Sequence, residues 1–214
     1  MYKVVETPDN HDILFKESNE NYFNSTIIRT GQDNFYLFSE GYKIAAIKLF
    51  EQFEGCAYDA SVLVYPLVFL NRQFIELRLK EMICGLNYAN SQKYQFSGTH
   101  NLKSLWDSYL NLIKTPGLGY IPDSFLLKNV ERLIIEFNTI DPKSSAFRYP
   151  VDNSDDRNPS LFIKNLDIDN FVLTMKKLYN FFDLQSDFIF HLIDFTDELI
   201  SDMRAQYIED LRSG

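Results

Sequence analysis

The residue patterns that mark common catalytic and metal-binding proteins are missing from this sequence. It has only two cysteines, Cys56 and Cys84, and neither stands in a CxxC or Cys/His spacing, so a structural zinc site is not expected. The glycine-rich phosphate motifs GxGxxG and GxxxxGK[ST] are absent, as are HExxH and GxSxG. We therefore expect no cofactor, no metal and no catalytic residue of a familiar type, and we favour a protein that is not an enzyme.

The three histidines do not form a recognisable metal-binding or catalytic pattern either. His11, His100 and His191 stand far apart in the sequence. Only His191 has a carboxylate residue four positions away, Asp187. A single histidine between apolar neighbours is more often a packed, hydrogen-bonded side chain than a metal ligand. We expect the same of His191.

Basic charge and long apolar runs are also scarce. The chain has 21 Lys and Arg against 30 Asp and Glu, a net charge of -9. Nucleic-acid binding depends on basic side chains that neutralise phosphates, so it is disfavoured here. A basic patch that forms only on folding is the remaining alternative. The longest apolar run, SVLVYPLVFL, is too short for a membrane span, and the N-terminus does not resemble a signal peptide. We expect a cytoplasmic protein with reduced thiols and no membrane contact.

Aromatic residues, by contrast, are abundant, with 19 Phe, 13 Tyr and 1 Trp among 214 residues. Large rings build cores, and some can cover a subunit interface. A chain of this length suits one domain that needs no disulfide. Residues 1–33 are polar with short apolar groups and predict an extended segment or small β-hairpin packed on the body. Residues 34–214 predict a single helical domain.

Apolar residues at spacings of three and four predict the first helices of that domain. The first helix should cover about residues 35–53, with Gly55 as its stop. Its apolar stripe consists of Phe35, Phe38, Tyr42, Ala45, Ala46, Leu49, Phe50 and Phe53. A second helix, at roughly 60–90, is apolar on nearly every face and should be central and buried. Pro66 either lies in its first turn or kinks it.

Capping residues predict where the later helices begin. Thr99 is the expected N-cap of a third helix, and Asp123 or Ser124 that of a fourth. One or two last helices should follow Asp167 or Asp169. The predicted class is therefore all-α, an antiparallel up-and-down helical bundle.

The central helix carries three charged residues that share one face. Arg72, Glu76 and Lys80 follow one another at spacings of four. One interpretation is a salt-bridge stripe on the solvent side. The other is that the charges are partly buried, because the rest of the helix is apolar, and that they need partners. The candidate partners are His100, Asp141 and Arg148.

The stretch FRYP, residues 147–150, places Arg148 and Tyr149 directly before Pro150. The proline favours an extended backbone at Tyr149, which can hold the arginine in one orientation. Planar guanidinium groups suit pairing with a carboxylate or a ligand phosphate. Arg148 can thus be a structural partner of a buried acidic residue, with Tyr149 covering the core, or a ligand-binding residue.

Three short motifs in order carry a family resemblance. They are ELRLKEMI at 76–83, GTHNLKSLW at 98–106 and FRYP at 147–150. Together they make residues 60–150 resemble bacterial HEPN-domain proteins. The resemblance implies an up-and-down bundle, commonly dimeric, and often encoded in toxin–antitoxin or phage-defence settings. Many such proteins are metal-independent endoribonucleases with an Arg five to seven residues before a His. No histidine of this chain has such an arginine.

The resemblance also implies a recurrent polar cluster, to which Glu76, Lys80, His100, Arg148 and Tyr149 would belong. Our leading hypothesis is a non-catalytic, HEPN-like dimeric module that binds a partner protein or a small ligand. The alternative is an RNA- or nucleotide-processing enzyme, with His100 as general acid–base and Arg148 on a phosphate. A third possibility is that the cluster is purely structural. Its predicted members are Arg72, Glu76, Lys80, His100, Asp141, Arg148 and Tyr149.

Overall fold

The structure is a computed structural model, and by its internal contacts the chain divides into two units, Met1–Thr30 and Gly31–Gly214. The described residues are 7–8, 11–15, 28–31, 34–53, 57–91, 93–115 and 122–213. Most of the segment for which a hairpin was expected lies outside them, and so do Gly55 and Cys56. The described stretches of that segment contain no strand.

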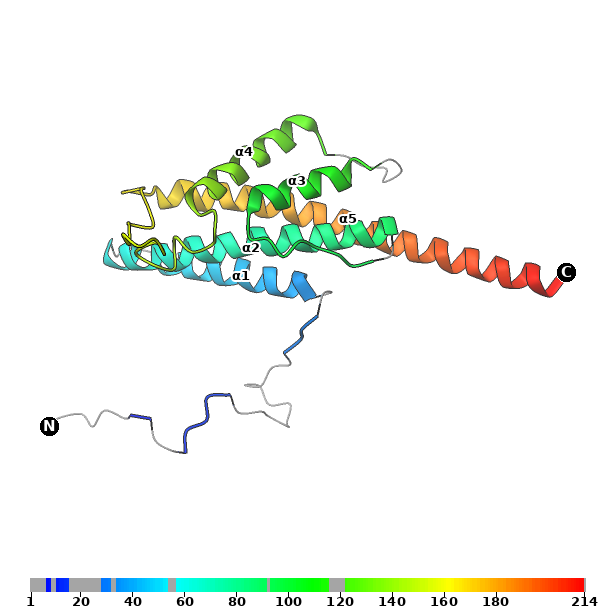
Figure 1. Cartoon of the computed structure of the whole chain (residues 1–214), viewed down its shortest axis with the longest axis horizontal. Helices are drawn as coiled ribbons and strands as arrows, with labels where there is room; N and C mark the ends of the chain where they lie inside the picture. Colours follow the sequence, from blue (N-terminus) through cyan, green and yellow to red (C-terminus); the bar gives the residue numbers. More distant parts are fainter. Residues whose placement is uncertain are drawn as a thin grey trace. The chain divides into compact units, whose positions relative to one another are not determined.

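The described residues of the second unit form five α-helices and one 3₁₀ turn (Figure 1). They are α1 (Phe35–Phe50), η2 (Glu51–Phe53), α2 (Ala57–Ser91), α3 (Leu102–Ile113), α4 (Ser124–Ile140) and α5 (Ile168–Ser213). Among the described residues the only β-pairing is an isolated bridge between Val151 and Pro159. The predicted all-α helical bundle is confirmed. Within the same residues, no helix combines the length and the apolar character that a membrane crossing requires.

Helix α2 is the centre of the bundle, as its apolar sequence predicts. It packs against α1, α3 and α5 (Figure 1), and Phe74, Ile75 and Leu79 are fully buried on it. Pro66 lies inside α2 and not in its first turn, since the helix already begins at Ala57. The interpretation that the helix starts near Tyr65 is therefore wrong.

The apolar stripe predicted for α1 is only partly the buried face. Ser39 and Ala46 are its buried residues, while Phe38 and Ala45 are exposed. At 100° per residue, Phe38 lies about 90° around the helix from the centre of the buried face. A stripe drawn from hydrophobicity alone was therefore too wide on that side.

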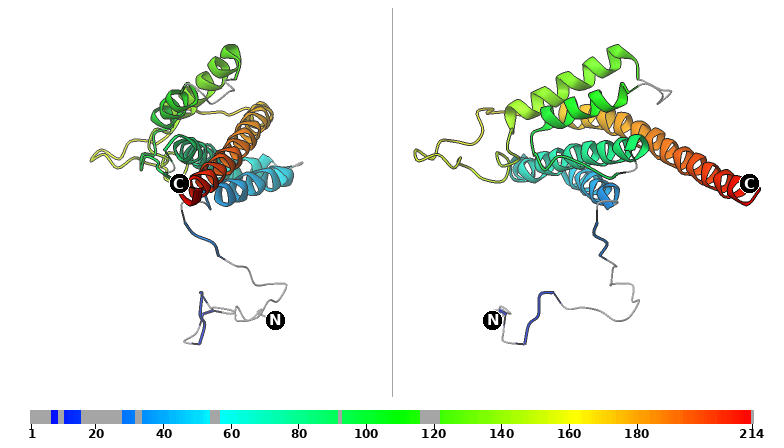
Figure 2. Two further views of the ribbon diagram at one scale, coloured as in Figure 1. Left: turned by 90° about the vertical axis from the view of Figure 1, so that its right-hand side faces the viewer. Right: turned by 45° about the vertical axis from the view of Figure 1, so that its right-hand side comes forward.

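Helices α2 and α3 run in the same direction, which departs from strict up-and-down alternation (Figures 1 and 2). Residues 93–100 return along α2, from its end at Ser91 to the level of Arg72, whose guanidinium binds the carbonyl of His100. An extended segment of eight residues spans about 26–29 Å, close to the roughly 28 Å of helix that it retraces. The start of α3 then lies beside the end of α4, where Leu102 N donates to Asn138 Oδ1 at 2.9 Å.

Polar side chains fix the helix starts. Asn101 is the N-cap of α3, because its side chain accepts a hydrogen bond from Ser104 N. The prediction of Thr99 as the cap is wrong: Thr99 Oγ1 accepts from Asn101 N, which lies before the helix. Asp123 caps α4, as predicted. Asp167 Oδ1 accepts from Asn170 N at 2.9 Å, in the first turn of a single last helix, α5.

Candidate functional site

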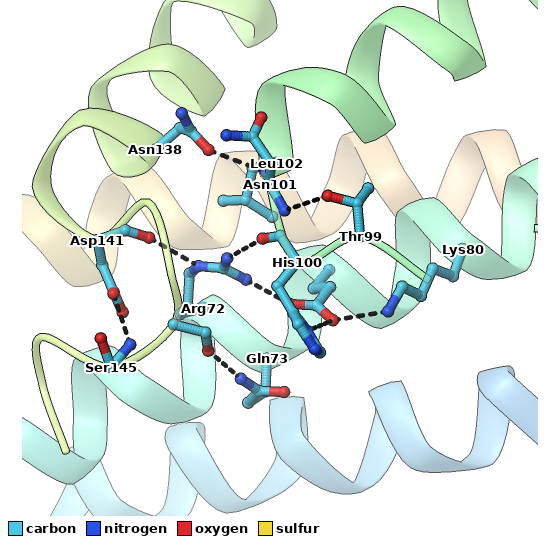
Figure 3. Close-up of polar contacts among 12 residues, drawn as sticks. Arg72, Gln73, Lys80, Thr99, His100, Asn101, Leu102, Asn138, Asp141 and Ser145 are labelled. Carbon is cyan, nitrogen blue, oxygen red and sulfur yellow. Dashed lines mark hydrogen bonds and ion pairs between the residues drawn. The ribbon is translucent and has the colours of Figure 1, made fainter. Parts of the chain in front are cut away.

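The three charged residues of α2 form a buried ion cluster with one another (Figure 3). Arg72 Nη1 donates to Glu76 Oε2 at 2.8 Å, and Lys80 Nζ donates to Glu76 Oε1 at 2.8 Å. The exposed fractions of the three residues are 0%, 2% and 6%. The interpretation as a solvent-side stripe is therefore wrong, and the buried alternative is correct.

Two segments far along the chain complete this cluster. His100 Nδ1 lies 2.8 Å from Glu76 Oε1, and the His100 carbonyl accepts from Arg72 Nη2. Arg72 Nε also donates to the carbonyl of Asp141 at 3.4 Å. Of the three partners expected from the sequence, His100 and Asp141 thus meet the cluster, Asp141 through its backbone.

The environment of the cluster shifts two pKa values. Burial by itself raises the pKa of Glu76, but the hydrogen bonds from Lys80 and His100 outweigh it, and the net pKa is lowered. Burial lowers the pKa of Arg72, against the opposing effects of Glu76 and Asp141. Glu76 is therefore held as a carboxylate between cations, which suits a structural ion cluster better than a proton donor.

Asp141 connects the buried ion cluster to the loop that follows α4. Its Oδ1 accepts from Ser145 N at 2.7 Å and from Ala146 N at 3.0 Å. Ser144, in a left-handed conformation with φ 57°, accepts from Gln73 Nε2 at 2.6 Å. The start of the FRYP loop is thereby fixed to α2 through Asp141 and Ser144.

Arg148 does not join the buried cluster. It is exposed, its Nε donates to the Ser144 carbonyl at 2.7 Å, and its guanidinium lies 5.7 Å from the ring centre of Phe69 and 5.3 Å from that of Tyr149. The expectation that Arg148 meets the charges of Glu76 and Lys80 is wrong. The tight turn at Ser144 sends the chain toward Phe69, two helical turns before Glu76.

Arg148 and Tyr149 instead line a cavity of about 860 Å³, here called the Arg148 cavity. Residues of the loop after α4 and of the first turns of α2 surround it. Its lining includes Ser61, Tyr65, Arg148, Tyr149, Ser160 and Lys164. Among the described residues that line it, two are cationic, Arg148 and Lys164, and none is an Asp or a Glu.

Hydrogen bonds preform the loop that closes this cavity. Asp152 N donates to the Asn158 carbonyl at 2.8 Å, and Ser160 N donates to the Pro150 carbonyl at 3.2 Å. The Ser160 hydroxyl donates to the Ala146 carbonyl at 2.9 Å. Neither Lys164 nor the hydrogen bonds that join the two ends of this loop were predicted from the sequence. Pro150, Pro159 and the Asn, Asp and Ser residues between them are nevertheless typical of a turn.

A second buried charge cluster, which was not predicted from the sequence, surrounds Arg78 of α2. Arg78 is fully buried on α2 and pairs with Glu81 at 2.9 Å, with Asp183 of α5 at 3.3 Å and with Glu40 of α1. Its guanidinium also lies 4.8 Å from the ring centre of Tyr36. The spacing of three between Arg78 and Glu81 in an apolar helix was the available signal.

Neither ion cluster gathers metal ligands. In the part of the chain that the structure describes, no group of three His, Cys, Asp or Glu side chains could hold a metal ion. Comparisons with protein-family models, with curated proteins and with solved structures gave no match.

Proposed function

We propose that this chain is a non-catalytic, HEPN-like helical module that acts as a dimer and binds a small organic anion in the Arg148 cavity. The charge of this cavity is the main support for the proposal that it binds an anion. In a chain of net charge -9, the cavity is lined by Arg148 and Lys164 with no carboxylate among its described lining residues. An acidic protein that places two cations, and no carboxylate among the described lining residues, in one concave site favours a negatively charged ligand there.

The cavity also has the size and the polarity that such a ligand needs. Its volume, about 860 Å³, is within the usual range for small-molecule sites. Tyr65 and Tyr149 are each about half exposed beside the cations and offer ring faces to a flat or apolar part of the ligand. A phosphate or carboxylate on an aromatic or apolar body, as in a nucleotide, fits this combination.

The HEPN-like part is supported by contacts between the motifs of the resemblance. Glu76 and Lys80 come from the first motif, His100 comes from the second, and all three meet in one cluster. Asp141 connects that cluster to the loop that carries FRYP. Three of the five residues that the resemblance implies thus lie together, whereas Arg148 and Tyr149 line a separate cavity.

The non-catalytic part is supported by how the polar groups are used. Glu76 is paired on both carboxylate oxygens, with Arg72 on Oε2 and with Lys80 and His100 on Oε1. Arg148 contacts Phe69 and Ser144, so no observation joins it to His100 as the enzymatic alternative requires. Turnover of a nucleotide or RNA that is lost in both His100→Ala and Arg148→Ala would overturn this part.

A thermal-shift panel tests the ligand part on the full chain. The panel holds inorganic phosphate, nucleoside mono- and diphosphates, and small aromatic carboxylates. A compound present at 100 times its Kd stabilises the folded state by about 2.7 kcal/mol, which raises Tm by roughly 5–10 °C for a chain of this size. No shift with any compound of the panel would contradict the proposal.

Variants then locate the site. Arg148→Ala should abolish the shift, and Arg148→Lys should keep a part of it, because lysine retains the charge but loses the planar donor pattern. Lys128→Ala is the control for loss of a surface cation, since Lys128 is exposed on α4 and does not line the Arg148 cavity. A shift that survives Arg148→Ala would place the ligand elsewhere.

A further inference from the structure

The second half of α5 extends beyond the other helices (Figures 1 and 2). Its large apolar side chains are exposed. We call residues 195–213 the α5 tail. Six large apolar side chains of this tail are 47–72% exposed: Phe195, Leu199, Met203, Tyr207, Ile208 and Leu211. Monomeric soluble proteins rarely leave a contiguous apolar patch of this kind open to water.

The exposed face continues the buried face of the same helix. Leu178, Phe182 and Ile189 are buried at spacings of four and seven, and Leu199 and Met203 extend the same helical periodicity. A helix face of this pattern is stable when a second surface covers it, because most of the stability of a helix in a protein comes from packing of its apolar face. The tail therefore has the sequence of a packed helix, but six of its large apolar side chains stay exposed among the described residues.

A matching surface lies between α4 and the first half of α5. The two helices border an apolar groove of about 650 Å³, here called the α4/α5 groove. Its lining includes Leu126, Val130, Leu133, Phe137, Phe171 and Leu178. Helix α4 has 17 residues, a length of about 25 Å, and the apolar stripe of the tail from Phe195 to Leu211 has the same length.

The charges of the tail and the groove are complementary. The tail contains five Asp or Glu and two Arg, which give it a net charge of -3. The groove is lined by the exposed cations Arg132 and Lys177 and by one acidic residue, Glu136, which pairs with Arg132 at 3.5 Å. Its lining therefore has a net charge of +1, to which Lys177 contributes the unpaired cation among the described residues. Pairing two tails with each other would instead bring two acidic segments together, which like-charge repulsion disfavours.

We propose that the α5 tail of one chain docks in the α4/α5 groove of a second copy of this chain. With two-fold symmetry each copy gives a tail and receives one, which closes a dimer through two equivalent contacts. The mode is an amphipathic helix in a groove, with Leu199, Met203 and Leu211 as apolar anchors. This inference rests on the dimer part of the proposed function and is independent of the Arg148 cavity.

Light scattering coupled to size-exclusion chromatography tests the proposal on the full chain. The wild type should be a dimer at micromolar concentration. The tail variant Leu199→Asp/Met203→Asp and the groove variant Arg132→Glu/Lys177→Glu should each raise the dimer dissociation constant at least about tenfold. Because all four side chains are exposed, both variants should keep the helical circular dichroism of the wild type.

Two controls carry matched changes outside the proposed contact. Leu173→Asp places the same substitution on an exposed position of α5 that does not line the groove. Lys48→Glu/Lys176→Glu matches the charge reversal at exposed positions of α1 and α5 that also lie outside the groove lining. Both controls should stay dimeric.

Mixing the two variants separates this contact from others. A mixture should form a heterodimer through one intact contact, the tail of the groove variant in the groove of the tail variant. A wild type that is monomeric would overturn this inference together with the dimer part of the proposed function. A dimer that withstands either variant, or a mixture that forms no complex at tenfold higher concentration, would overturn the tail-in-groove contact alone.

Discussion

His100 Nδ1 lies 2.8 Å from Oε1 of Glu76, and this contact joins an exposed ring to a buried carboxylate. The His100 side chain is 65% exposed, whereas that of Glu76 is 3% exposed. Arg72 and Lys80 complete the shell of the carboxylate from inside the bundle. Glu76 therefore holds together α2, the segment that returns along it and, through Arg72, the end of α4.

Removing this carboxylate should destabilise the bundle strongly. We expect Glu76→Ala to lower the free energy of unfolding by about 3–5 kcal/mol, because it leaves Arg72 and Lys80 buried without their counter-charge. Urea unfolding at pH 7 measures the change. Glu136→Ala is the control: its pair with Arg132 is 67% exposed on both sides, so the loss should stay below about 1 kcal/mol. Equal losses in the two variants would contradict a structural role for the cluster.

The same carboxylate should make stability depend on pH. The pKa of Glu76 is lowered in the folded protein from an ordinary value of 4.5, so its stabilising effect is complete above that value and disappears as the pH falls through the folded pKa. The difference in unfolding free energy between the wild type and Glu76→Gln should therefore be constant near neutral pH and shrink below pH 4.5. Unfolding curves from pH 7 to pH 3 measure it, and a constant difference over this range would contradict the prediction.

Glu81 provides a contrast of opposite sign. Burial raises its pKa, against the opposing effect of Arg78, so the folded state binds a proton on Glu81 more readily than the unfolded chain does. Its contribution to stability therefore decreases as the pH rises through that range. Relative to the wild type, Glu81→Gln should become more stable as the pH rises from 4.5 toward neutrality, the reverse of the trend for Glu76→Gln. The same unfolding curves distinguish the two.

Much of the fold follows from periodicity, because helical spacing of apolar residues is a local property of the sequence. The apolar character of α2 predicted its central place, and Asp123 predicted the start of α4. The parallel course of α2 and α3 is not local. It depends on Arg72 binding the carbonyl of His100, a contact between residues 28 positions apart.

The candidate site was predictable only where helical spacing placed its members together. The spacing of four put Arg72, Glu76 and Lys80 on one face, but it could not decide whether that face is buried. Arg148 was assigned to the wrong neighbours, since its direction depends on the left-handed turn at Ser144. Lys164 reaches the same cavity through a loop closure that no periodic pattern encodes.

Gly85 should be needed for the close approach of α2 and α5. A Cβ there would lie 2.5 Å from Cγ2 of Ile189, so Gly85→Ala should cost about 1–3 kcal/mol of unfolding free energy through overpacking. Gly41→Ala, at an exposed position of α1 with nothing within 4 Å of the added Cβ, should be neutral or stabilising by up to about 1 kcal/mol.

A double-mutant cycle checks the cause. Ile189→Ala removes the clashing methyl group, so the loss in Gly85→Ala/Ile189→Ala should be smaller than the sum of the two single losses. Urea unfolding of the four proteins provides the cycle. Additive losses would show that Gly85 matters for a reason other than its contact with Ile189.

The thiol of Cys84 should be inert in the folded protein. It is buried on α2, and burial, with a smaller effect from Glu81, raises its pKa from 9.0 to about 11. At pH 8 this shift alone lowers the thiolate fraction about 100-fold, and the thiolate is the reactive form. With Cys56→Ser as background, iodoacetamide should alkylate the native protein at least about 100-fold more slowly than the urea-unfolded protein, measured by mass spectrometry. Rates within tenfold of each other would mean that α2 opens readily at Cys84, which contradicts its place at the centre of the bundle.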